Sequence, residues 1–213
     1  MSDAPSVLPE TPPPDAPIPS GVWATFLHAA IAAAIFGTAY SAACGAVFAG
    51  WLTPESQSDA TAHRAHLRLM AQRDPGELFT HIVTTNLKAT AALLVVGVAT
   101  AGLFAIAYTA IFAAHVAISS APAVAAGVPT SVVAAFLVPH GVVEMPALWL
   151  AAGVGLRAGV LFCGYLASGH LPARAVSRQL AWGAAASLAL VPVAAVVEAY
   201  VTPAVGAWML GPG

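Results

Sequence analysis

Three ionisable side chains stand in apolar sequence, where such groups are rare: His140, Glu144 and Glu198. His140 and Glu144 are four residues apart, so a helix would put them on one face about 6 Å apart. One imidazole and two carboxylates are suited to three chemistries. The first is a hydrogen-bonded structural cluster. The second is a site that ligates a divalent cation, which activates water, and the third is a relay of protons along a solute path. This spacing is not a specific signature, so all three readings stay open.

We therefore take His140, Glu144 and Glu198 as candidate catalytic and metal-ligating residues, with Glu144 either a ligand or the general base. A divalent metal is the cofactor that this set would accept, and no other cofactor is indicated. In an arrangement with four crossings, His115 reaches the same depth and is expected to join the cluster, together with His28.

Asn86 and Arg157 are expected at a second polar level. Arg157 follows Glu144 by thirteen residues, which is roughly 20 Å along one helix at about 1.5 Å per residue. The two side chains are therefore too far apart to pair. The long arginine side chain is expected to reach toward the opposite membrane surface.

The composition explains why these few polar groups stand out. Of 213 residues, 59% are apolar and 8% are charged, and the mean hydropathy is +0.83. Soluble domains carry roughly a quarter charged residues, so the chain is predicted to be a multi-pass protein of the cell membrane, in contact with the lipid bilayer. Seven Lys and Arg residues and a net charge of −2 leave no basic face, which excludes nucleic-acid binding.

The pattern of apolar segments predicts an all-α, polytopic membrane helix bundle with four to five transmembrane segments. Residues 1–21 are rich in proline and acids and are expected to be a disordered tail, and residues 22–210 form one membrane domain. Residues 52–80 are a polar loop with an interfacial helix at 61–73. The stretch 82–118 suits one long tilted helix or a helix plus a re-entrant piece. Pro139-His140-Gly141 and Pro146 predict a broken or re-entrant half-helix before a full helix.

Small residues recur at helical spacing in two segments. Gly37, Ser41 and Gly45 form a ribbon in the first apolar segment, and Gly155 and Gly159 flank Arg157. Small residues let two membrane helices approach closely and pack by van der Waals contact. We expect both sets to serve helix packing within the chain, and a homo-oligomer contact is the alternative for the ribbon.

Three strings resemble the stage II sporulation protein M family of prokaryotic integral membrane proteins. They are VPHGVVEMPA at 138–147, AAGVGLRAG at 151–159 and EAYVTP at 198–203. Asn86, which opens the second segment, also matches, and the resemblance covers residues 22–205. One departure is His115-Val116, where the family pattern leads us to expect Asn-Gly.

The resemblance implies five membrane segments and a role without catalysis. Members in sporulating bacteria act with other membrane-anchored proteins, one of them a peptidoglycan hydrolase, and relatives accompany bacteriocin gene sets. We therefore expect a scaffold or assembly partner for envelope proteins. An intramembrane metal-dependent hydrolase is the main alternative, and a transporter, exporter or immunity-type membrane protein is a third class.

The positions of the arginines bear on the number of crossings. Four crossings would place Arg64, Arg68, Arg73, Arg174 and Arg178 on one side of the membrane, as the positive-inside rule prefers. Five crossings would divide them between the two sides. The charge pattern therefore favours four, against the family expectation of five.

Overall fold

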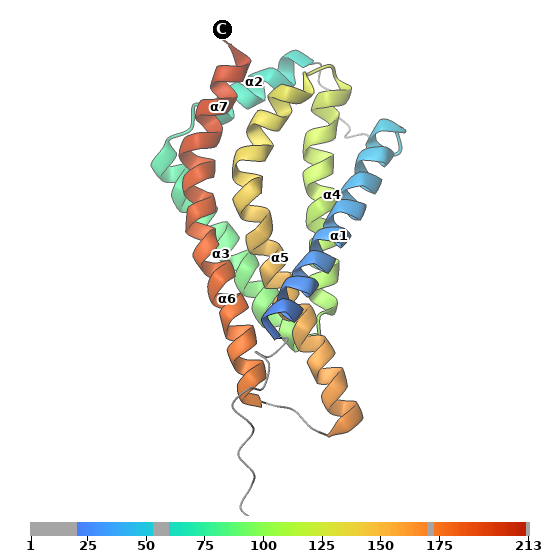
Figure 1. The fold of residues 1–213 in the computed structure, drawn as a ribbon. Coiled ribbons are helices and arrows are strands. Elements are labelled where there is room, and N and C mark those ends of the chain that lie inside the picture. Colours follow the sequence, from blue (N-terminus) through green and yellow to red (C-terminus); the bar gives the residue numbers. More distant parts are fainter. Residues whose placement is uncertain (1–20, 53–59, 170–172, 212–213) are drawn as a thin grey trace, which may run out of the picture.

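A computed structural model describes residues 21–52, 60–169 and 173–211 of the chain. Every regular element in these residues is a helix, which confirms the all-α prediction (Figure 1). The elements are α1 (Gly21–Phe48), α2 (Ala60–Ala71), α3 (Pro75–Ala99), α4 (Leu103–Ala125), α5 (Thr130–Ser168), α6 (Ala173–Val196), the π-helical segment η1 (Val197–Val201) and α7 (Thr202–Leu210). The predicted tail falls almost entirely outside the described residues.

Five helices in the described residues are long and apolar enough to cross a membrane. They are α1, α3, α4, α5 and the continuous run of α6, η1 and α7. The outer surface of the bundle exposes many large apolar side chains, among them Trp23, Ile111 and Leu166. Lipid acyl chains are the medium that such a surface requires. The chain is thus a polytopic membrane bundle, with five rather than four candidate crossings.

The additional crossing arises from a tight turn inside the apolar stretch 82–118. Helix α3 ends at Ala99 and α4 begins at Leu103, with Ala101 and Gly102 at positive φ between them. The Thr100 hydroxyl donates to the Val96 carbonyl at 2.7 Å and accepts from the Phe104 backbone N–H at 3.1 Å. These bonds satisfy backbone groups at both helix ends, so the turn needs few polar side chains. The expectation of one tilted helix or a re-entrant piece was wrong for this reason.

Helix α5 runs unbroken for 39 residues through Pro139 and Pro146. The expected half-helix and the turn at Pro139-His140-Gly141 are therefore absent from this segment. Each proline removes one backbone hydrogen bond, and packing against neighbouring helices tolerates that loss inside a membrane bundle. The continuous helix keeps His140 and Glu144 one turn apart on the same face.

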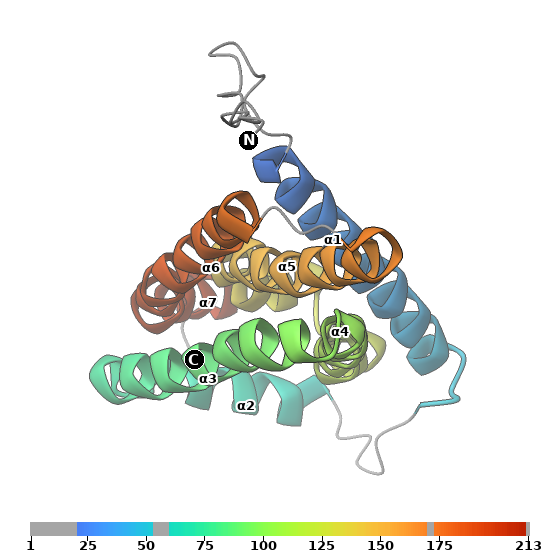
Figure 2. The ribbon, with the colours of Figure 1, turned by 90° about the horizontal axis from the view of Figure 1, so that it is seen from below.

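Helix α5 is the centre of the bundle, with α1, α3, α4 and α6 around it (Figure 2). Its contacts depend on glycine, because a Cβ atom on Gly153 would lie 2.7 Å from the Ala29 backbone nitrogen of α1. A Cβ atom on Gly155 would lie 3.2 Å from the Gly97 Cα atom of α3. Such close backbone approach is how membrane helices gain packing energy. The prediction that Gly155 and Gly159 serve packing within the chain agrees with these contacts.

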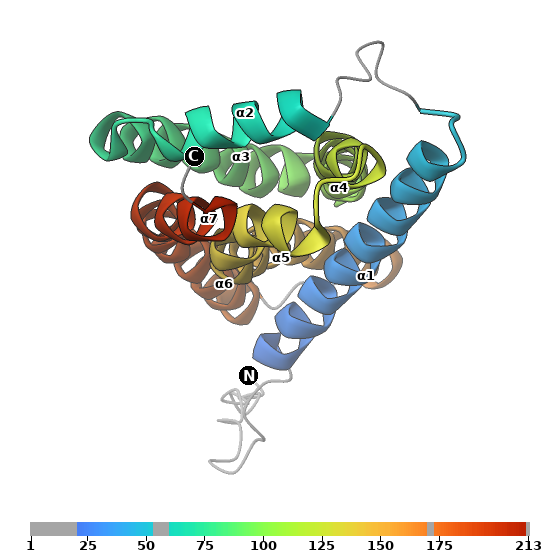
Figure 3. The same ribbon diagram turned by 90° about the horizontal axis from the view of Figure 1, so that it is seen from above.

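Helix α2 lies across the end of the bundle where α7 finishes (Figures 1 and 3). Leu67 of α2 and Met209 and Leu210 of α7 pack against the same buried cluster, which is formed by Ala123, Val128, Val132 and Val133. Asp74 caps the next helix, since its Oδ2 accepts the Glu77 backbone N–H at 2.8 Å. The short helix expected at residues 61–73 is thus present as Ala60–Ala71, and it marks the bundle end opposite the start of α1.

Five crossings place the start of α1 and the end of α7 on opposite sides of the membrane. We predict that a reporter inserted before Gly21 and a reporter placed after Gly211 give opposite compartment signals. Paired alkaline phosphatase and fluorescent protein fusions measure this in intact cells. Equal signals from the two positions would restore the arrangement with four crossings.

Gly159 offers a test of the packing around α5. A Cβ atom at this position would clash with the Ala101 carbonyl oxygen in the turn between α3 and α4. We expect Gly159→Ala to lower the free energy of unfolding by about 1–3 kcal/mol, measured by denaturant titration in micelles.

Gly164→Ala is the matched control, because a Cβ atom there meets nothing within 4 Å. It should leave stability unchanged or raise it by up to about 1 kcal/mol, since alanine favours the helix. Equal destabilisation by both variants would contradict the close approach at Gly159.

Candidate functional site

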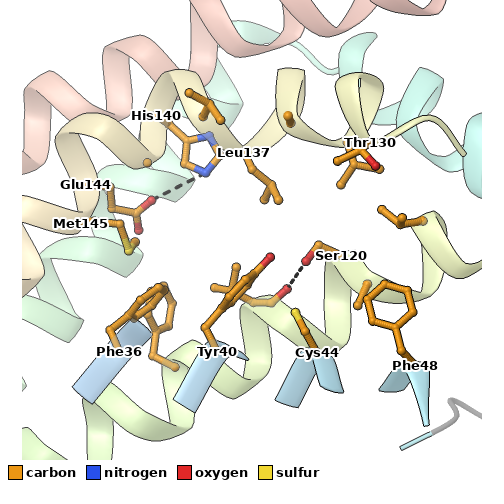
Figure 4. Close-up of a pocket in the computed structure, with 18 residues that line it drawn as sticks. Phe36, Tyr40, Cys44, Phe48, Ser120, Thr130, Leu137, His140, Glu144 and Met145 are labelled. Carbon is orange, nitrogen blue, oxygen red and sulfur yellow. Dashed lines mark hydrogen bonds and ion pairs between the residues drawn. The ribbon is translucent and has the colours of Figure 1, made fainter. Parts of the chain in front are cut away.

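His140, Glu144 and Glu198 come together inside the bundle. One ligand atom from each side chain can be chosen so that all three lie within 4.8 Å of one another. His140 Nε2 and Glu144 Oε2 are 3.9 Å apart, and these side chains are 17% and 12% exposed (Figure 4). The structure thus unites the three candidate residues from two segments that are more than fifty residues apart in sequence.

The cluster depends on the π-helical segment η1. Pro203 lacks a backbone N–H and cannot continue a regular α-helix behind it, so a wider turn precedes it. The Thr202 hydroxyl donates to the Val197 carbonyl at 3.3 Å and lies 3.5 Å from His140 Nδ1. The π turn carries Glu198 toward α5, while Thr202 links the same turn to His140.

Asn86 of α3 closes another side of the cluster. Its side chain lies beside the Glu144 carboxyl group, although its Nδ2 atom is buried without a hydrogen bond of acceptable geometry. Asn86 was expected at the level of Arg157, whereas it accompanies Glu144. Thr202 was not singled out from the sequence, although the Thr-Pro pair that shapes the π turn was visible there.

The cluster holds two carboxyl groups close to each other without a lysine or arginine partner. Glu144 and Glu198 lie near enough to interact electrostatically. Among the described residues, no lysine or arginine side chain lies within 4 Å of either carboxylate. The neighbours identified above, Asn86 and Thr202, are neutral, so the site would favour a proton or a cation between the acids.

A cavity of about 580 Å³ lies beside the cluster, between α1, α4 and α5. Side chains of α1 line one side in a row one turn apart, and His140 and Glu144 stand on the opposite side with Met145 (Figure 4). The α1 row consists of Phe36, Tyr40, Cys44 and Phe48. The space is mostly apolar, and its polar end is the pair of α5 side chains. A small molecule or lipid chain in this cavity would contact both.

Two histidines expected at the same depth lie elsewhere. His115 is exposed on α4, and it does not belong to the group of ligand atoms formed by the other three residues. His28 lies near the start of α1, with its Nδ1 2.6 Å from the Ala24 carbonyl oxygen. The expectation depended on four crossings, and the fifth helix places the cluster away from the end of the bundle where α1 begins and His28 lies.

Arg157 lies on α5 well away from Glu144, as the helix spacing requires. It is flanked by Leu156, against which Gly102 of the α3–α4 turn packs, and its Nε atom is buried without a hydrogen bond. Arg157 therefore lies near the turn that joins α3 to α4. It contributes no charge to the cluster.

The ribbon on α1 is not used for packing within the chain. Gly37, Ser41 and Gly45 are exposed, and a Cβ atom on either glycine meets nothing within 4 Å. The expectation that this ribbon packs inside the protomer was wrong, because α1 contacts α4 and α5 through other residues, such as Ala29, Ala32 and Phe36. These small residues instead form an outward-facing strip.

The fold and site define an integral membrane helix bundle with a polar cluster in its interior. The family model for stage II sporulation protein M matches residues 24–203. The chain therefore belongs to the stage II sporulation protein M family. No curated protein and no solved structure gives a significant match.

Thr202 tests how far the cluster stabilises the fold. The residue is buried and bonds both within the π turn and toward α5. We expect Thr202→Val, which keeps the shape but loses the hydroxyl group, to lower the free energy of unfolding by about 0.5–1.5 kcal/mol. Denaturant titration in micelles measures the change.

Thr84→Val is the control for this substitution. Thr84 is exposed on α3, and its hydroxyl donates within the same helix to the Thr80 carbonyl at 2.8 Å. Its loss should change stability by less than about 0.5 kcal/mol. If the two variants behave alike, Thr202 has no special structural role.

Proposed function

We propose that the protein is a non-catalytic scaffold of the plasma membrane, which binds transmembrane helices of envelope proteins. The observation that carries this proposal is the outward-facing strip of Gly37, Ser41 and Gly45 on α1. In lipid there is no hydrophobic force between helices, so a strip that lets backbones approach closely is a means of association. The family resemblance, which implies assembly with a membrane-anchored peptidoglycan hydrolase, agrees with such a role.

The position of α1 supports this proposal. The helix lies on the outside of the bundle and crosses it obliquely, with α4 and α5 on its inner side (Figures 2 and 3). The glycines that α1 packs against belong to other helices, since Gly153 of α5 lies against Ala29 and Gly183 of α6 lies against Thr25. The strip on α1 is therefore available to a helix from another protein without any rearrangement of the core.

The strip is tested by filling it. We expect the double variant Gly37→Leu/Gly45→Leu to reduce recovery of a membrane-anchored peptidoglycan hydrolase with the tagged protein by at least tenfold, which corresponds to about 1.4 kcal/mol. Co-purification from native membranes in mild detergent, with quantitative mass spectrometry, measures this. Circular dichroism and thermal unfolding establish that the variant is folded.

Gly164→Leu is the control, because this glycine, near the C-terminal end of α5, is also exposed with open space around it. It should not change recovery of the hydrolase. If the double variant abolishes cross-linking between two copies of the chain and leaves the hydrolase unaffected, the strip is a homodimer contact and the scaffold proposal fails.

The metal-dependent hydrolase is the second candidate, because the His140, Glu144 and Glu198 cluster adjoins a cavity large enough for a ligand. In that case His140 and Glu198 would be ligands, and Glu144 would be a ligand or the general base. This function requires the cluster to bind a metal ion.

A further inference from the structure

We propose that His140, Glu144 and Glu198 form an intramembrane binding site for a divalent transition-metal ion, with zinc as the best match to the ligand set. The proposal concerns binding and holds whether or not the protein is a scaffold. It is carried by the convergence of three ligand side chains from α5 and η1 beside a cavity. An imidazole nitrogen with two carboxylate oxygens is a set that zinc accepts, leaving a fourth position for water or another ligand.

The distances require only small movements. For three atoms that are at most 4.8 Å apart, there is a point within about 2.8 Å of all of them, compared with zinc–ligand distances of about 2.0–2.2 Å. Rotation of the glutamate side chains supplies the remaining shift of less than about 1 Å. The His140 Nε2 to Glu144 Oε2 distance of 3.9 Å is already near the spacing of two ligands on one ion.

The charge of the site also favours a cation. Two carboxyl groups in a largely apolar interior interact with each other, and among the described residues no lysine or arginine side chain lies within 4 Å of them. A divalent ion would compensate both charges at once, and a proton shared between the acids would compensate one. A site that holds a divalent ion and a site that holds only a shared proton would give different results in a metal titration.

Neighbouring side chains hold the proposed ligands in orientation, and the cavity gives a path to them. Thr202 lies 3.5 Å from His140 Nδ1, so Nε2 is the nitrogen left for a metal ion. The Asn86 side chain adjoins the Glu144 carboxyl group, and its buried Nδ2 lacks a hydrogen-bond partner. Partners of this kind fix the orientation of ligands in metal sites. The cavity reaches His140 and Glu144 from residues such as Thr130 and Val124, near the end of the bundle where α2 lies.

The test uses the full chain in detergent or nanodiscs, without a polyhistidine tag. His63→Ala/His66→Ala is the background, because these two α2 histidines would otherwise offer zinc a surface site. After chelator treatment, the protein is dialysed against zinc chloride and its zinc content is measured by elemental analysis. We expect about one zinc per chain, with magnesium failing to compete.

His140→Asn and Glu198→Gln should each weaken zinc binding by at least about tenfold. Cobalt should give visible absorption bands that are lost in the same variants. His115→Ala is the control, because it removes an exposed histidine of another membrane helix. Circular dichroism and size-exclusion profiles show whether each variant folds, and Glu144→Gln supplies a second conservative change should either of the others unfold.

Two results would overturn the site. The first is a background protein that binds no zinc after dialysis, which would leave a shared proton as the account of the two acids. The second is zinc binding that falls equally in His115→Ala and in folded cluster variants. Loss of zinc together with intact hydrolase recovery would keep the metal site separate from the scaffold role.

Discussion

The fold depends on backbone contact between helix α5 and the helices around it. Lipid tails are as apolar as leucine, so membrane helices are not driven together by removal of apolar surface from water. Close approach at Gly153 and Gly155 replaces that force and fixes how α1 and α3 lie against α5. Since α5 also carries His140 and Glu144, the same contacts determine where the polar cluster stands. Helix α5 therefore determines both the packing of the bundle and the position of the polar cluster.

Prolines modify this helical framework without breaking it. Pro139 and Pro146 each remove a backbone bond from α5, and the helix continues because its neighbours enclose it. Pro203 has a larger effect, since the π turn before it changes the direction of Glu198. Local irregularity in α6–α7 thus brings a second acid to the acid on α5.

Composition was sufficient to predict a membrane helix bundle, because 8% charged residues among 213 is far below the proportion in soluble domains. It was also sufficient to identify His140, Glu144 and Glu198 as a possible group. The number of crossings was not predictable from hydropathy, since the turn at Thr100-Ala101-Gly102 is satisfied by a hydroxyl and the backbone rather than by charged residues. That single turn reverses the direction of the later helices and separates the cluster from the end of the bundle where His28 lies.

Proline and glycine were the misleading signals. Pro139-His140-Gly141 predicts a break in an isolated helix, but the prediction takes no account of support from neighbouring helices. The glycines at 37 and 155 both lie in small-residue patterns, yet one faces outward and the other meets Gly97. Only the arrangement of the helices separates these cases, because sequence spacing gives the face of a helix and not what covers it.

Helix α1 connects the two features that sequence alone left unassigned. Phe36, Tyr40 and Cys44 line the cavity, and Gly37, Ser41 and Gly45 follow each of them by one residue, about 100° around the helix. A helix packed on the outward strip would therefore contact the wall of the cavity that His140 and Glu144 face. Because α1 is held mainly by its contacts with α4 and α5, it is the element through which an external partner would act on the interior. The outward strip and the cavity-lining row lie on adjacent faces of α1, so the proposed helix association and the proposed cation binding would be linked through this one helix.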